Sequence, residues 1–337
     1  MIQRLVAGAV AVVALASCTG EDAPSGSGPR TSVSVSQSPS STTPTAGPGV
    51  ERLVVPAAAE SFPETWTEAF VIPHGRGPAR LGESQGAAAP DGTWWFLDPA
   101  KQRVAHYDVD GTYLEQVKVT RALGRTTFQW SQPHVLADGT FVAVRLDPPR
   151  SWLLRVRDGL VSEVQVRGLF SPDHDDGRLL YGSVGKGRHV VVDPSDGSRE
   201  RTETFRTPDG TRFFVGNGFD NGRLRVELPD AAVSGALRMR TASGAVAHVG
   251  VEVRAGEDGR IHLFLVGTGE DEDSAPLVGY ASIGPTGSVS AVEALPSPFS
   301  DADPGSPAHL VVAPGSSTPM LVYVLDDGVH VYEREAG

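Results

Sequence analysis

A short unit recurs in the chain and restricts its fold more than any other feature. SQGAAAPDGT begins at Ser84 and SQPHVLADGT begins at Ser131, and an apolar segment follows each copy. Asp-Gly favours a tight turn between antiparallel strands, because glycine adopts positive φ without steric cost. Four further turns of this kind, the last of them Pro-Gly, also precede apolar segments and place glycine at Gly177, Gly210, Gly259 and Gly315.

Residues 84–117 contain the clearest copy, which parses as four short strands separated by three turns. The turns are predicted at Asp91-Gly92, at 99–102 and at Asp110-Gly111, with strands over Trp94–Leu97 and Val104–Asp108. The other apolar segments are also short and rich in β-branched and aromatic residues, and no sustained helical periodicity occurs. Four antiparallel strands in about 40–50 residues form one blade of a β-propeller. We therefore predict an all-β propeller over 51–337 with about six blades, five or seven remaining open.

The first copy resembles an NHL-type blade. Asp98, Arg103-Val104 and Asp110-Gly111 occupy the positions of that family's pattern. The resemblance implies a closed ring, and we expect an N-terminal strand to complete the last blade. Either Arg52–Val55 or Thr67–Ile72 is predicted to pair with Gly328–Glu333 for this purpose. Trp94 and Trp95 point to opposite faces of their strand, so both are predicted to fill blade interfaces.

The first fifty residues have the pattern of an export signal followed by a tether. Arg4 precedes the apolar run Leu5–Leu15, which is too short to span a bilayer and fits a signal peptide over 1–17. Leu15-Ala16-Ser17-Cys18 resembles the lipobox of bacterial lipoproteins, here of actinobacterial type, and this resemblance implies acylation (palmitate) at Cys18. The alternative is a chance cysteine in a cleaved signal. Residues 18–50 then form a disordered Ser/Thr/Pro/Gly tether.

The net charge and the cysteine content limit the classes of binding partner and the cellular location that we expect. The formal net charge of −12 disfavours nucleic acid as a partner, and it also disfavours electrostatic docking onto anionic lipid. Cys18 is the only cysteine, so no intramolecular disulfide is possible. We predict a monomer on the extracytoplasmic face of the cell membrane, held there by its lipid anchor. Its expected partner is an envelope protein, a glycan or a small ligand.

No catalytic motif of the common hydrolases, zinc proteases or nucleotide-binding enzymes occurs in the sequence. The candidate ligand site comprises polar residues in the first strands of blades, which line the central channel: Gln85, Gln132, His134 and His309. No metal or cofactor is predicted. The acidic loops 172–177 and 269–274 lack a complete calcium-binding pattern, and the second is predicted as a hairpin tip. Four other histidines are assigned to strand packing or the surface: His106, His189, His262 and His330.

These features favour a binding or scaffolding module at the cell envelope over an enzyme. The alternative is catalysis in the channel, by a metal-dependent lyase or hydrolase similar to the streptogramin lyases, or by a quinoprotein-like dehydrogenase. The clustered histidine and acid pattern that such enzymes require is not evident in the sequence.

Overall fold

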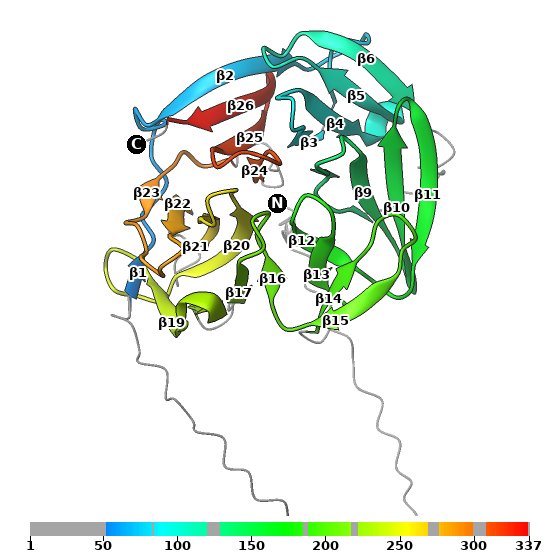
Figure 1. Cartoon of the computed structure of the whole chain (residues 1–337). Helices are drawn as coiled ribbons and strands as arrows, with labels where there is room; N and C mark the ends of the chain where they lie inside the picture. Colours follow the sequence, from blue (N-terminus) through cyan, green and yellow to red (C-terminus); the bar gives the residue numbers. More distant parts are fainter. Residues whose placement is uncertain are drawn as a thin grey trace, which may run out of the picture. The chain divides into compact units, whose positions relative to one another are not determined.

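The computed structural model describes the chain over 52–82, 84–119, 129–184, 188–216, 222–268, 276–298 and 308–335. The segments 1–51 and 269–274, and with them Cys18, lie outside the described residues. Residues 46–337 form one compact unit. Its strands fold into six sheets arranged as blades around a central channel, which confirms the all-β propeller with six blades (Figure 1).

The first three blades follow one another along the chain, each ordered from the channel outward. Blade 1 contains β3 (Gln85–Ala88), β4 (Trp94–Asp98), β5 (Arg103–Tyr107) and β6 (Tyr113–Lys118). Blade 2 contains β7 (Gln129–Trp130), β8 (His134–Val135), β9 (Phe141–Asp147), β10 (Arg150–Arg157) and β11 (Leu160–Val166). Blade 3 contains β12 (Ser171–Asp175), β13 (Leu180–Ser183), β14 (His189–Val192) and β15 (Arg199–Thr202).

The remaining blades include two strands from the N-terminal segment. Blade 4 contains β16 (Phe205–Arg206), β17 (Arg212–Gly216), β18 (Arg223–Leu228), β19 (Val233–Arg240) and β1 (Arg52–Val54). Blade 5 contains β20 (His248–Ala255), β21 (Ile261–Thr268), β22 (Leu277–Ile283) and β23 (Glu293–Ala294). Blade 6 contains β24 (Ala308–Val312), β25 (Pro319–Leu325), β26 (Gly328–Arg334) and β2 (Trp66–Pro73).

The six predicted turns all lie between the first and second main strands of a blade. Their glycines have φ between +72° and +89°, at Gly92, Gly139, Gly177, Gly210, Gly259 and Gly315. In five of these turns the aspartate before the glycine accepts a hydrogen bond from the backbone N–H two residues on, as Asp91 does from Thr93. The helical segments in the described residues are two three-residue 3-10 turns, Pro99–Lys101 and Pro229–Ala231.

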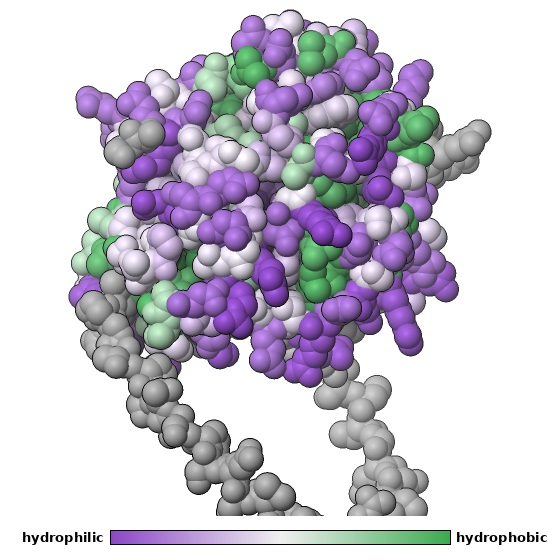
Figure 2. All heavy atoms as spheres, viewed as in Figure 1, coloured by the Kyte–Doolittle hydropathy of each residue, from purple (hydrophilic) through white to green (hydrophobic). Residues whose placement is uncertain are grey.

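Blade faces are apolar on both sides and pack against both neighbours. Trp94 belongs to the cluster that joins blade 1 to blade 6, whereas Trp95 belongs to the cluster that joins blade 1 to blade 2. This confirms that the two tryptophans fill opposite interfaces. At the surface shown in Figure 2, hydrophilic residues predominate and hydrophobic residues form separate small patches. No helix in the described part of the chain is long and apolar enough to cross a membrane.

The segment before blade 1 contacts three successive blades. Arg52–Val54 pairs in parallel with β19 of blade 4, Ala58 and Ala59 donate backbone hydrogen bonds to blade 5, and β2 pairs antiparallel with β26 of blade 6. Of the two closing strands proposed from the sequence, the second therefore closes the ring, over Trp66–Pro73. We call residues 52–73 the N-terminal strap.

We expect Ile72→Ala to lower the free energy of unfolding by about 2–5 kcal/mol, because Ile72 is 1% exposed and packs between β26 and blade 1. The exposed Thr67 on the same strand provides the control, since Thr67→Ala removes no buried contact. Urea unfolding of both variants measures the difference. Equal stability of the two would show that β2 contributes little to closure.

Candidate functional site

Blade 4 has an incomplete inner strand, and this shapes the channel. β16 contains only Phe205 and Arg206, which pair with Phe213 and Arg212 of β17. β17 continues to Gly216, and on its outer side Phe214–Gly216 pair with β18. On the inner side no described strand accompanies Phe214–Gly216. The channel therefore extends sideways into blade 4.

The open edge of β17 presents backbone groups to this space. Thr207 N–H donates to Thr211 O at the turn, and hydrogen-bonded pairs alternate along an antiparallel ladder. This alternation directs the peptide groups of Val215 toward the missing strand. They have no partner on that side among the described residues. They are available to a ligand.

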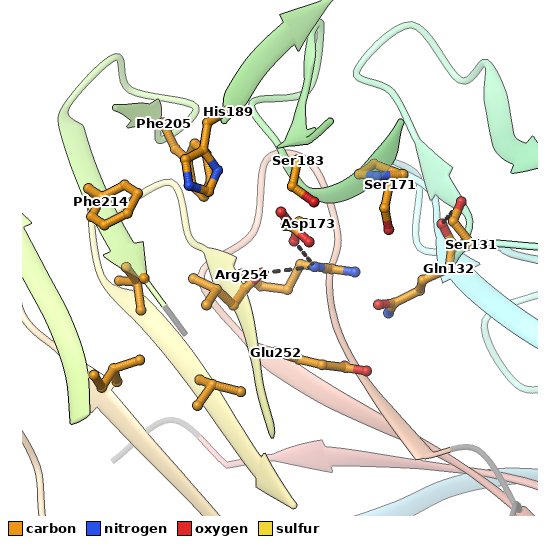
Figure 3. Close-up of a pocket in the computed structure, with 16 residues that line it drawn as sticks. Ser131, Gln132, Ser171, Asp173, Ser183, His189, Phe205, Phe214, Glu252 and Arg254 are labelled. Atoms are coloured by element: carbon orange, nitrogen blue, oxygen red, sulfur yellow. Dashed lines mark hydrogen bonds between the residues drawn. The ribbon is translucent and has the colours of Figure 1, made fainter. Parts of the chain in front are cut away.

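Arg254 bridges blades 3 and 5 across the short end of blade 4. It extends from β20 and is 6% exposed. Its Nη1 donates to the backbone carbonyl of Asp173 on β12, at 2.6 Å, and to its neighbour Val253 O, at 2.8 Å (Figure 3). No ion pair in the described part of the chain involves its guanidinium. Among the described residues, the hydrogen bonds of this nearly buried cation go to carbonyl oxygens.

A cavity of about 570 Å³ surrounds this arginine. Its polar wall comes from blades 2 and 3 and includes Ser131, Gln132, Ser171 and Ser183. Its apolar wall comes from blades 4 and 5 and includes Phe205, Phe214, Leu224, Val251 and Val253. Figure 3 shows Arg254 between the two walls, with Asp173 and Glu252 nearby. The cavity is within the size range of pockets for small molecules.

Two carboxyl groups in the cavity are less acidic than usual. The Asp173 side chain is open to the channel but enclosed by its walls, and this desolvation raises its pKa to about 7, against the opposing effect of Arg254. Burial also raises the pKa of Glu252, again against Arg254, while Glu252 Oε2 accepts a hydrogen bond from Leu310 N–H at 2.7 Å. With a pKa of about 7, Asp173 carries its negative charge in only part of the molecules at neutral pH, whereas Asp175, on which Arg254 also acts, has a lowered pKa and stays ionised.

Of the four residues predicted to form the ligand site, one lines this cavity. Gln132 lines the cavity, and its Nε2 donates to Leu310 O at 2.8 Å, on the opposite side of blade 1. Gln85 is half-buried on β3, and its Oε1 has no hydrogen-bond partner in the described residues. Gln85, His134 and His309 are absent from the cavity wall. Ligand contact with these residues stays a prediction.

His134 and His309 both link the inner strands of adjacent blades. His134 Nδ1 lies 2.6 Å from Asp175 Oδ2, so Nδ1 carries the proton, and burial lowers the pKa of His134. His309 Nε2 accepts the N–H of Gly86 at 3.1 Å, and burial lowers its pKa to about 4. Both imidazoles are therefore neutral near pH 7. The first link joins blade 2 to blade 3, and the second joins blade 6 to blade 1.

His189 lines the cavity although its sequence context indicated packing. Its ring makes edge contacts with Phe205 and Phe214, and its Nδ1 is buried without a partner among the described residues. The acidic segment 172–177 lies largely in β12, and its Asp173 faces the cavity. Among the described residues, no three His, Cys, Asp or Glu side chains are grouped so as to hold a metal ion.

Arg254, Glu252 and Asp173 gave no sequence signal, because single charged residues occur in many strands. Their shared position depends on the missing part of β16. A short first strand in the fourth repeat, before Gly210, is the one feature of the sequence from which the cavity could have been found.

We expect His309→Ala to lower the free energy of unfolding by about 1–3 kcal/mol, because the N–H of Gly86 would lose its buried acceptor. Gln85→Ala, one residue away, removes a side-chain carbonyl that has no partner in the described residues and should change stability by less than about 0.5 kcal/mol. Denaturant unfolding of the two variants is the measurement. An unchanged free energy of unfolding for His309→Ala would mean that this imidazole does not hold β3 to β24.

Comparison with known proteins places the chain in a family and gives it distant structural neighbours. The solved neighbours include the calcium-binding protein regucalcin from Agrobacterium tumefaciens, with 14% identity and a TM-score of 0.43, covering 85% of this chain and 97% of that one. Virginiamycin B lyase from Staphylococcus aureus has 10% identity and a TM-score of 0.42, and the match covers 75% of this chain and 85% of that one. The PQQ-bound aldose sugar dehydrogenase from Streptomyces coelicolor has 12% identity and a TM-score of 0.43, and the match covers 80% of this chain and 98% of that one.

At these identities and TM-scores the likeness does not extend to function. A comparison with curated proteins finds no match. A family model described as a domain of unknown function, DUF7485, matches residues 64–334, from just before β2 to the end of β26. The chain therefore belongs to the DUF7485 family.

Proposed function

We propose that this chain is an exported, lipid-anchored binding protein of the cell envelope, whose propeller takes a small amphipathic anion into the cavity at blade 4. One observation carries the ligand part of the proposal. Arg254 is nearly buried, its guanidinium has no carboxylate partner in the described residues, and it stands in a cavity of about 570 Å³. A buried charge without a counter-ion is costly, and a bound anion removes that cost.

The two walls of the cavity define the rest of the ligand. Serine hydroxyls and the amide oxygen of Gln132 offer hydrogen bonds on one side, whereas Phe205, Phe214 and Leu224 offer apolar contact on the other. The open peptide groups of Val215 lie at the apolar side. The proposed ligand is therefore a carboxylate or phosphate ester with an apolar part and further hydrogen-bonding groups.

The location is inferred from the residues before the propeller. The apolar run Leu5–Leu15 ends at Ala16-Ser17-Cys18, and a Ser/Thr/Pro/Gly segment follows. Acyl chains on Cys18 would hold the protein at the outer face of the cytoplasmic membrane, since two chains give stable attachment where one gives marginal binding. The tether would then allow the propeller to meet ligands in the surrounding aqueous phase.

We expect a panel of small carboxylates and phosphate esters to contain members that raise the melting temperature of the wild-type protein but not of Arg254→Gln. Binding stabilises the folded state in proportion to the logarithm of ligand concentration above Kd, so thermal shift is the measurement. The effect should strengthen as the pH falls through about 7, because protonation of Asp173 removes a negative charge beside Arg254.

Two controls separate ligand binding from stability. Arg178→Gln removes an equal charge from an exposed position in blade 3 and should leave the shift unchanged. Phe214→Ala removes apolar wall area and leaves the arginine contacts intact, so it should reduce the shift. A ligand whose shift persists in both Arg254→Gln and Phe214→Ala would bind elsewhere, and a panel with no stabilising anion would refute the ligand class.

Substitution of Cys18 tests the anchor. Cys18→Ala should release the protein from the detergent phase and leave its melting temperature unchanged, because every described strand lies between Arg52 and Arg334. Detergent partitioning and the intact mass of the N-terminal peptide are the measurements. Wild-type protein in the aqueous phase, with no added acyl mass, would show that the cysteine is not an anchor.

A further inference from the structure

Three arginines are in register across the outer strands of blade 4, and a fourth points to the same face. Arg52 on β1 is directly opposite Arg238 on β19, and Arg238 is directly opposite Arg223 on β18. Partners in register point to the same face of a sheet, and Arg240, two residues beyond Arg238, points to that face as well. The intervening residues Leu53 and Met239 point to the other face and are buried. We call Arg52, Arg223, Arg238 and Arg240 the arginine row.

This arrangement is unfavourable within the protein itself. Like charges directly opposite each other on adjacent strands are destabilising. No ion pair in the described part of the chain includes Arg52, Arg238 or Arg240, although the chain has more acidic than basic residues. The same three residues, with Gly244, line a cavity of about 410 Å³ at the outer edge of the ring. A cationic hollow of this kind fits a phosphate group.

We propose that the arginine row docks the rim of the propeller onto anionic phospholipid headgroups. The choice of lipid over other phosphates rests on the proposed anchor at Cys18, and on the path of the chain. The proposed tether precedes β1 in the chain, and Arg52, the first residue of β1, is itself a member of the row. Tethering raises the local concentration of headgroups near this edge without any new contact.

The net charge of −12 disfavours long-range attraction to anionic lipid, but it does not prevent contact binding through the arginine row. At physiological ionic strength, exposed charges are screened beyond about 8–10 Å, so the local charges of the row determine the potential that a headgroup meets. β19 and β1 lie at the outer edge of blade 4 (Figure 1), away from the channel. Docking there would bring the rim to the bilayer and leave the cavity around Arg254 accessible from the aqueous phase.

Vesicle flotation tests the proposal on a chain that begins at residue 46, which retains every described strand and lacks Cys18. We expect this chain to float with vesicles of phosphatidylcholine and phosphatidylglycerol, but not with phosphatidylcholine alone, and to be released by added sodium chloride. Arg52→Gln, Arg238→Gln and Arg240→Gln together should weaken partitioning by roughly a hundredfold, from about fivefold per arginine near an anionic surface.

The matched control removes three exposed arginines from other parts of the ring: Arg76→Gln, Arg150→Gln and Arg178→Gln. It should partition like the wild type, and the melting temperatures of both triple variants verify folding. Failure to float with phosphatidylglycerol, or equal loss in the two triple variants, would overturn the proposal. Release by inorganic phosphate, but not by sodium chloride of equal ionic strength, would identify a site for a free anion and overturn lipid docking. None of these outcomes depends on acylation of Cys18 or on the ligand of the blade 4 cavity.

Discussion

The pairing of β2 with β26 is the interaction on which the rest of the structure depends. A propeller blade cannot bury both of its faces alone, and six blades do so only when the ring is closed. Closure here brings Trp66–Pro73 beside Gly328–Arg334, so the first and last parts of the folded chain share one sheet. Glu293 on blade 5 reinforces this joint, because it accepts hydrogen bonds from Trp66 and Arg334. Every inner strand, and therefore every cavity residue, takes its place from this ring.

Within the closed ring, the short β16 is the main departure from regularity. The five other blades have longer or divided first strands that face the channel, whereas blade 4 leaves β17 open over Phe214–Gly216. Arg254 reaches across this gap to β12, and its charge also acts on Asp173 and Glu252. The irregular blade thus combines an open strand edge, a buried cation and an apolar wall. This combination is the basis of the proposed ligand site.

The local pattern of the sequence predicted the class of fold and the number of blades, because each Asp-Gly or Pro-Gly turn is encoded by adjacent residues. Gly92 and Gly259, far apart in the chain, adopt the same conformation for the same steric reason. The candidate site was harder to predict. His309 has the position expected of a channel residue, yet its ring nitrogen is used by Gly86 N–H. The arginine row depends on the register of β1 against β19, and no local pattern specifies a parallel pairing between residues 52 and 238.

The N-terminal strap also determines how the propeller would respond to mechanical load. Any pull along the chain from the N-terminal side reaches Arg52 first, then the blade 5 contacts of Ala58 and Ala59, and only then the closing strand β2. These attachments are loaded in series, so the short β1 would peel away before force reaches the ring closure. The released residues would lengthen the tether and so reduce the force on the remaining contacts. Under load, the N-terminal strap would therefore detach first at β1 of blade 4, while the ring closure and the cavity stay intact.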